Sequence, residues 1–185
     1  MNTLNILKKV CMYLNRQDEF SLLSSEDEEE IAQSEVCNTF LFCLNYVIKR
    51  IATDFCFCRV CENIQIEDNY YYLQDLQNNL FSVIQLKNVN GVQGFYEDGV
   101  GIKANSGDYT LTYAYMPPDF NFLDDITCFP SCVNEDVVAL GVVAHYFLIS
   151  GYYSEHNTYE EKFLDRINLL TNKKSEKVVK GKIWQ

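Results

Sequence analysis

A change in the spacing of apolar residues, from helical to alternating and back, limits the fold of this chain more than any other feature. In residues 3–16, 27–54 and 135–171 apolar side chains recur every three or four residues, which predicts amphipathic helices. Residues 56–115 instead alternate in short segments, which is typical of antiparallel strands. Helices at both ends of a chain pack together to bury their apolar stripes. The sequence therefore predicts an α+β fold, in which a helical bundle of N- and C-terminal helices carries an inserted antiparallel β-meander or sandwich at about 56–116.

The N-terminal part is predicted to contain two helices separated by a polar break at residues 17–30. Thr3 is expected to cap the first helix, and Ser25 with Glu28 fits a capping box at the start of the second. The acidic run that closes the break suits a first helical turn, because the helix dipole favours negative charge there. The apolar stripe of the second helix is wide enough to pack against two elements or against a neighbouring subunit. Its members include Ala32, Val36, Phe40, Leu44, Val47 and Ile51.

The turn sequences of the central region place its strands. Asn90-Gly91, Asp98-Gly99 and Ser106-Gly107 each supply a residue that accepts positive φ, and all three are typical of β-hairpins. Alternation around these turns predicts strands at 59–66, 80–86, 92–96, 100–104 and 109–115. Met116-Pro117-Pro118 is expected to end the sheet, because proline has no N–H to donate to a neighbouring strand.

The C-terminal part is predicted to form a hairpin of two helices. Asn134 is a suitable N-cap for a helix over 135–150, and Gly151 is a suitable residue for its C-terminal cap. Ser154 is expected to cap a last helix over 155–171. Two helices joined by so short a turn pack against each other in antiparallel fashion.

The charge is distributed unevenly along the chain. The formal net charge is −11, but residues 173–185 contain five Lys and one Glu, so this segment carries +4 and the rest of the chain −15. A body this acidic repels phosphate, which disfavours general binding of DNA or RNA. We therefore expect a single domain over 1–172 and an extended basic tail over 173–185. Such a tail is either a docking arm for an acidic partner or a frayed terminus.

The chain lacks the signals of secretion and of membrane insertion. Lys8 and Lys9 interrupt the N-terminal apolar run, so no signal peptide is expected. No stretch reaches the about 18 apolar residues of a transmembrane helix, and the longest apolar run, 137–149, suits a buried helix. A non-secreted, non-membrane protein is expected.

No enzyme signature is present in the sequence, and we expect a protein that is not an enzyme. The glycines do not form a phosphate loop, and no nucleophile elbow or His-x-x-x-His pair occurs. His145 is expected to be a core or interface residue, and His156 is expected to be exposed near a turn. A hydrolase that uses Asp124 or Asp125 would need a cleft that shifts their pKa values, whereas a solvated loop is the simpler interpretation.

The eight cysteines leave a zinc site open as an alternative. Without a secretory signal, reduced thiols are the default. Cys58-x-x-Cys61 and Cys128-x-x-x-Cys132 together offer four thiolates, enough for a tetrahedral zinc site. Neither pair lies in a glycine-rich knuckle, so we expect no metal and no other cofactor. A zinc-stabilised interaction protein remains the alternative.

Three parts of the sequence together are similar to one known family. The first part is a leading helix with Asn38, Leu41, Leu44, Asn45, Ile51 and Ala52. The second part is the segment Tyr113-Ala114-Tyr115-Met116-Pro117-Pro118, followed by an acidic loop and an apolar helix. The third part is a last helix with Tyr159, Lys162 and Phe163, followed by a basic tail that contains Trp184. This pattern, over roughly residues 30–185, resembles the head-to-tail adaptor (connector or neck) proteins of tailed bacteriophages, especially short-tailed ones.

The resemblance implies a structural virion protein, made in the cytoplasm of the bacterial host and located in the neck of the particle. It implies a ring of about twelve copies that binds the portal protein and a tail or nozzle protein, while the genome DNA passes through the lumen without sequence-specific binding. Another tail-completion or minor tail protein is the alternative. The residues expected to bind the portal are Lys173, Lys174, Lys177, Lys180, Lys182, Ile183 and Trp184. The residues expected at the subunit interface are Phe40, Leu44, Val47, Ile51, Tyr146, Tyr159 and Phe163.

Overall fold

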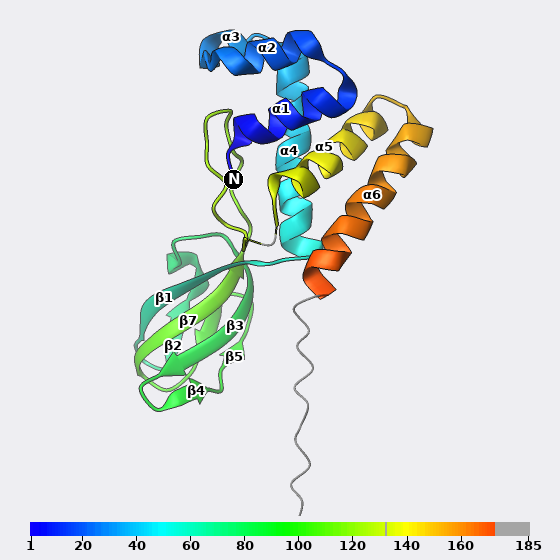
Figure 1. Ribbon diagram of the computed structural model, residues 1–185. Helices are drawn as coiled ribbons and strands as arrows, with labels where there is room; N and C mark the ends of the chain where they lie inside the picture. Colours follow the sequence, from blue (N-terminus) through cyan, green and yellow to red (C-terminus); the bar gives the residue numbers. More distant parts are fainter. Residues whose placement is uncertain (132, 173–185) are drawn as a thin grey trace, which may run out of the picture. The chain divides into compact units, whose positions relative to one another are not determined.

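The chain divides into two compact units in a computed structural model, which describes residues 1–131 and 133–172 (Figure 1). The helical unit comprises Met1–Ile48 and Phe120–Gln185, and the β unit comprises Lys49–Asp119. All strand pairs are antiparallel among the described residues. The expected α+β class is therefore confirmed at this level.

Six helices are described along the chain. They are α1 (Thr3–Leu14), α2 (Gln17–Ser25), α3 (Glu28–Ala32), α4 (Glu35–Asp54), α5 (Glu135–Ile149) and α6 (Tyr153–Asn172). The expected polar break at 17–30 is therefore wrong, since α2 and part of α3 occupy it. Only a few apolar residues mark α2, and Leu23 is the one that becomes fully buried. A stripe this weak is not visible as helical periodicity.

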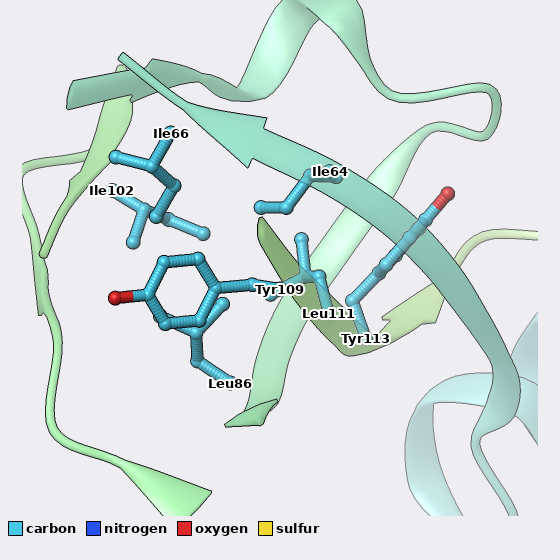
Figure 2. Packing of buried hydrophobic residues seen from close by; sticks show 7 residues of the cluster. All are labelled: Ile64, Ile66, Leu86, Ile102, Tyr109, Leu111 and Tyr113. Atoms are coloured by element: carbon cyan, nitrogen blue, oxygen red, sulfur yellow. The ribbon is translucent and has the colours of Figure 1, made fainter. Parts of the chain in front are cut away.

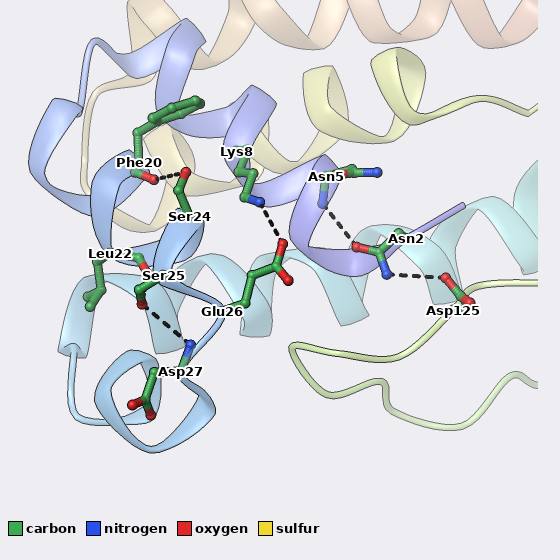
Figure 3. A network of polar contacts seen from close by, with 10 residues as sticks. All are labelled: Asn2, Asn5, Lys8, Phe20, Leu22, Ser24, Ser25, Glu26, Asp27 and Asp125. Atoms are coloured by element: carbon green, nitrogen blue, oxygen red, sulfur yellow. Dashed lines mark hydrogen bonds and ion pairs between the residues drawn. The ribbon is translucent and has the colours of Figure 1, made fainter.

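The first helix is capped by a residue other than the expected one (Figure 3). The Asn2 side chain accepts a hydrogen bond from the Asn5 N–H at 3.3 Å and donates one to Asp125 at 3.2 Å. Thr3 is fully buried, and its hydroxyl has no hydrogen-bond partner among the residues the structure describes. Asn2 therefore caps α1, because a cap must stand one residue before the first helical position.

The expected long helix over 27–54 is two helices. Glu26 has φ +58° and ends α2, and the Asp27 side chain accepts hydrogen bonds from the Glu29 and Glu30 N–H groups at the start of α3. The Ser34 hydroxyl then accepts a hydrogen bond from the Cys37 N–H at 3.3 Å, at the point where the separate helix α4 begins. Ser25 does not cap α3, because its hydroxyl accepts a hydrogen bond from the N–H of Asp27, which precedes that helix. The apolar spacing continues across the break, so periodicity alone does not detect it.

Helices α5 and α6 form the expected hairpin. Asn134 accepts from the Val137 N–H at 3.1 Å, and Gly151 has φ +80°, so both predicted boundaries of α5 are confirmed. The predicted cap of α6 is wrong, because the helix begins at Tyr153 and Ser154 already lies inside it. Within the helical unit, α5 lies between α1 and α6 and crosses α4 (Figure 1).

The β unit contains two antiparallel sheets. The larger sheet has the order β1-β7-β3-β4 and the smaller one the order β2-β6-β5. The strands are β1 (Cys58–Ile66), β2 (Tyr70–Tyr72), β3 (Leu80–Asn88), β4 (Gly91–Gln93), β5 (Tyr96–Glu97), β6 (Gly101–Lys103) and β7 (Gly107–Tyr115), with the short 3-10 helix η1 (Leu73–Asp75). This order differs from a meander, because the first and last strands lie side by side.

The pairing of β1 with β7 brings the two ends of the β unit together. Cys58 at the start of β1 lies opposite Tyr115 at the end of β7. Lys49 Nζ and Asp119 Oδ1, which stand at the two limits of the unit, form an ion pair of 2.6 Å. A segment whose entry and exit are adjacent can be inserted between two helices without separating them.

One apolar cluster is shared by both sheets (Figure 2). Its buried residues are Ile64, Ile66, Leu86, Ile102, Tyr109, Leu111 and Tyr113. Ile102 belongs to β6 of the smaller sheet and the others to β1, β3 and β7 of the larger one. The Tyr113 hydroxyl donates to Glu62 at 2.9 Å, so this buried phenol keeps a polar partner. Alternating side chains of facing sheets thus form the core of the β unit.

Two of the three expected hairpin turns are confirmed. Gly91 and Gly99 have φ of +112° and +83°, and they lie in the turns from β3 to β4 and from β5 to β6. The third predicted hairpin turn, Ser106-Gly107, is wrong, because this segment connects a strand of the smaller sheet to a strand of the larger sheet. A fourth turn was not expected: Asp68 and Asn69, with φ of +51° and +62°, join β1 to β2. Asn and Asp are the non-glycine residues that tolerate this conformation best.

The turn from β5 to β6 contains a carboxylate with several donors. Asp98 accepts from the Val100 and Gly101 N–H groups at 3.1 and 2.9 Å and from the Tyr70 hydroxyl at 3.1 Å. Lys103 Nζ lies 3.2 Å from the other carboxylate oxygen. These donors, the Gly101 N–H first, lower the pKa of Asp98 to about 2. The charged form is therefore favoured in the folded turn.

This shift predicts how the stability depends on pH. The folded pKa of Asp98 lies below the usual value of 3.8, so the carboxylate stabilises the fold above about pH 4, and this contribution is lost as the pH falls towards 2. Asp98→Asn should be less stable than the wild type at pH 7, and the difference should shrink between pH 4 and pH 2. Urea unfolding at a series of pH values measures this. Asp108→Asn, at an exposed position of β7, is the matched control, and a difference that is independent of pH would contradict the assignment.

Candidate protein–protein interface

Two groups of aromatic and aliphatic side chains on the helical unit are exposed or partly exposed. Contiguous exposed apolar surface on a folded chain commonly marks a site of protein interaction. We name the groups the α4–α5 face, made of Phe42, Tyr46, His145 and Ile149, and the α1–α6 face, made of Tyr13, Phe147, Tyr152, Tyr159 and Lys162.

The α4–α5 face is built around a stacked pair of rings. The ring of Tyr46 lies parallel to the imidazole of His145, with centroids 3.9 Å apart and an angle of 8° between the planes. Phe42 lies 6.4 Å from the same imidazole and is 62% exposed. Phe42 and Ile149 line a shallow hollow whose remaining wall is polar, formed by Gln33, Glu35, Asn38 and Thr39. The face therefore combines an apolar floor with a polar rim that carries one carboxylate.

The α1–α6 face is a chain of aromatic contacts. Tyr159 lies 6.4 Å from Tyr13 and 5.6 Å from Phe147, and Phe147 contacts Tyr152 edge-on at 6.1 Å. Lys162 Nζ lies 4.7 Å from the centroid of the Tyr159 ring, within the range of a cation–π interaction. Tyr152 is 58% exposed, so the cluster reaches solvent at the turn between α5 and α6.

The two faces lie on opposite sides of α5. A helix turns by about 100° per residue, so His145 and Ile149 point in nearly the same direction, and Phe147 points about 180° away from it. The residues before them, Val137 to Ala144, are all buried, so the N-terminal part of α5 is covered on every side. In the C-terminal part, α4 contacts α5 through His145 and α6 contacts it through Phe147, so the two surfaces are separate.

Charged side chains are exposed near both faces. The exposed carboxylates of residues 28–30 and Glu35 lie at and just before the start of α4. Lys162 and Arg166 are exposed on the turns of α6 that follow Tyr159. None of these six side chains forms an ion pair with another described residue, whereas Lys8, Lys9 and Arg16 of the same unit do. On α6, however, the exposed acids Glu155, Glu161 and Asp165 lie among the same turns as these two bases, so neither face has a charge of one sign.

Five of the seven expected interface residues are buried within the chain. Phe40, Leu44, Val47, Ile51 and Phe163 are each at most 1% exposed. They stabilise the interior of the chain itself and offer no surface to a neighbouring subunit, which corrects this part of the prediction. The stripe at three- and four-residue spacing is the side of the helix that the chain buries by itself.

The other two expected interface residues are partly exposed. Tyr159 belongs to the α1–α6 face, and Tyr146 contacts Phe40 edge-on at 5.1 Å and accepts a hydrogen bond from Arg16 at 3.4 Å. Sequence reasoning missed the exposed aromatic residues Phe42 and Tyr46. The sequence did contain a sign of them, because both are large aromatic residues on α4 outside its apolar stripe, where side chains do not pack into the core.

The expected portal-binding residues lie outside the described part of the chain. They are Lys173, Lys174, Lys177, Lys180, Lys182, Ile183 and Trp184. Their role stays a prediction from the sequence.

The two histidines differ from each other in their surroundings. His145 is partly exposed on the α4–α5 face, as described above. His156 lies within α6 and is half-buried, with Nδ1 2.9 Å from the Ala144 carbonyl oxygen. The expectation that His156 is exposed near a turn is therefore wrong. Its contact links α6 to α5 within the hairpin.

The cysteines considered for zinc do not gather in the described residues. Cys58 is buried and Cys61 is exposed on β1, because residues three apart on a strand point to opposite faces. Cys132 lies outside the described residues. In residues 1–131 and 133–172, no three His, Cys, Asp or Glu side chains are placed so that they could hold a metal ion.

Two other cysteines lie in the helical core. Burial raises the pKa of Cys11 and of Cys43 to about 12. Thiols with such pKa values stay protonated at neutral pH and behave as small apolar side chains.

Over the described ranges, none of the helices combines the length and the apolar content needed to cross a bilayer. Comparison with known proteins gives no match to any protein-family model and no match to a curated protein.

Proposed function

We propose that this chain is a structural subunit that assembles in many copies, as the head-to-tail adaptor of a tailed bacteriophage. The observation that carries the proposal is the pair of aromatic faces on opposite sides of α5. Aromatic residues are enriched at the centres of protein interfaces, since they bury a large area at a low cost in conformational entropy. A chain with two such faces can contact two neighbours at once. The resemblance of the sequence to phage neck proteins suggests which assembly these contacts would build.

In this proposal the chain forms a ring between the portal and the tail of the virion. The portal protein binds on one side, through the basic residues 173–185, and a tail or nozzle protein binds on the other. The rest of the chain carries a charge of −15, and an acidic lumen would let genome DNA pass without adhering to the wall. The portal and the tail protein are partners that the resemblance suggests.

Electron microscopy of the particle tests the proposal. We expect a closed ring of about twelve copies at the neck, because contacts between two different faces close by rotation. Purified chain mixed with the portal of the same phage should give a complex whose mass corresponds to several copies per portal ring. Omission of residues 173–185 should abolish this complex while the circular dichroism spectrum stays that of a folded chain. A single copy per particle, or no copy at the neck, would contradict the proposal.

A further inference from the structure

We infer that β1 of one copy pairs in antiparallel fashion with β1 of a second copy, with Cys61 at the twofold axis, so that the larger sheets of the two copies join into one. The partner is a second copy of this chain. The inference goes beyond the proposed function, because a twofold contact does not link successive subunits of a ring and therefore belongs to the free chain before assembly.

The two edges of the larger sheet are protected to different degrees. On one side, β4 pairs with β3 over only three residues, and the rest of β3 contains register shifts at Leu80/Ser82 and Val83/Gln85. Short edge strands and bulges of this kind hinder pairing with another chain. On the other side, β1 pairs with β7 over nine residues without a register shift. The edge suited to accept a further strand is therefore β1.

The outer edge of β1 has backbone groups that the chain does not pair. In an antiparallel pair, every second residue directs its N–H and C=O away from the neighbouring strand. Among the described residues, β7 is the only segment with which the backbone of residues 59–66 is paired. A row of free N–H and C=O groups matches the backbone of an extended peptide, which binds by adding a strand to the sheet.

Both ends of this free edge are defined by hydrogen bonds. At one end the Cys56 N–H donates to the Ile51 carbonyl oxygen at 2.8 Å, which belongs to the end of α4. At the other end the Glu67 carbonyl oxygen accepts from the Tyr70 N–H at 2.9 Å, in the turn to β2. The edge that a second strand can reach therefore lies between these two residues.

The register follows from the length of this edge. Residues that face each other across a sheet lie on the same side of it, so two copies of β1 overlap most completely with the twofold axis at Cys61 or at Glu62. An axis at Glu62 would place two carboxylates directly opposite each other, which destabilises a sheet. An axis at Cys61 instead places Glu62 opposite Val60 of the second copy and Arg59 opposite Asn63 of the second copy.

The charge of β1 permits two copies to meet. The chain has a net charge of −11, but β1 contains one base and one acid, Arg59 and Glu62, so the strand itself is neutral. In the register with Cys61 at the axis, neither of them faces a like charge. The other acids near the strand lie outside the paired residues; they are Asp54, Glu67, Asp68 and Asp108.

Disulfide trapping tests the register. Facing Cα atoms of an antiparallel pair lie about 4.5–5.5 Å apart, a distance that a disulfide can bridge. Mild oxidation of the full chain with copper phenanthroline should give a covalent dimer on a non-reducing gel, and Cys61→Ser should abolish this band. In the Cys61→Ser background, Arg59→Cys combined with Asn63→Cys should restore the dimer. Gln65→Cys alone, at an exposed position of the same strand, is the matched control and should not restore it.

Sedimentation velocity under reducing conditions tests the contact without a covalent bond. The wild type should dimerise as its concentration rises, and Cys61→Lys should weaken dimerisation by about tenfold or more, because two ammonium groups would meet at the axis. Ser82→Lys makes the same change in charge at an exposed position of β3 on the same side of the sheet, so it should have no effect. Circular dichroism shows whether each variant is folded.

Three results would overturn the inference. They are a wild-type chain that stays monomeric at every concentration, a folded Cys61→Lys variant that dimerises like the wild type, and a covalent dimer that persists unchanged in Cys61→Ser. A monomeric chain in which Cys61→Lys weakens binding to the portal instead would show that a strand of another protein covers β1.

The outcome also separates this inference from the proposed function. A ring at the neck of the particle, formed by a chain that is always monomeric in solution, would exclude the β1 contact while the adaptor role stands. A dimer that responds to these variants, in a chain that is missing from the neck, would exclude the adaptor role while the contact stands.

Discussion

Replacing Gly141 with valine should destabilise the helical unit by about 1–3 kcal/mol, the usual cost of overpacking a core. Gly141 lies where α5 packs against both α4 and α6. A Cβ atom there would lie 2.7 Å from Cγ1 of Val47 on α4 and 3.1 Å from the ring of Phe163 on α6. Both neighbours are fully buried, so neither can move into solvent. The added methyl groups would force the helices apart and misplace both aromatic faces.

The measurement is urea unfolding followed by circular dichroism at 222 nm, a wavelength at which helices dominate the signal. Gly94→Val is the matched control, because a Cβ at Gly94 meets no atom within 4 Å. Its effect should stay within about 0.5 kcal/mol, as for most surface substitutions. Alanine at position 141 should cost less than valine, because the gain in helix propensity of about 1 kcal/mol offsets part of the clash. If Gly141→Val is as stable as the wild type, the close packing of α4, α5 and α6 is not as described.

Replacing Leu111 with alanine should destabilise the β unit by about 2–5 kcal/mol, as expected for a leucine that leaves a cavity. Leu111 is 0% exposed and stands in the middle of β7, opposite Glu62 of β1 and Leu86 of β3. Its side chain belongs to the cluster that both sheets share (Figure 2). The loss of this contact should therefore loosen both sheets together.

Hydrogen exchange measured by mass spectrometry can locate this effect. Amides of β1, β3 and β7 should exchange faster in Leu111→Ala than in the wild type, since opening of the sheet becomes more frequent. Thr112→Ala is the control on the same strand, because Thr112 is only half-buried and its hydroxyl contacts the exposed Cys61. Faster exchange in α5 and α6 with no change in β7 would contradict the assignment of Leu111 to the β-unit core.

The exposed faces show why interface residues were harder to predict than core residues. Periodicity identifies the side of a helix that is buried, and Phe40 and Leu44 were found by this signal. It does not say whether the chain itself or a second copy covers that side. Phe42 and Tyr46, which the chain leaves exposed, lie off that stripe, so the stripe does not identify them.

The sequence by itself determined the features that depend on neighbouring residues. Asn134 and Gly151 bound α5 as predicted, and Gly91 and Gly99 form turns, because a cap or a tight turn is satisfied within a few residues. Only the tertiary structure decided the order of the strands, since the partner of β1 is β7, about fifty residues later, and many pairings bury the same alternating side chains. It likewise decided that α5 packs against both α4 and α6. This placement depends on Gly141 meeting Val47 and Phe163, three residues that lie far apart in the chain.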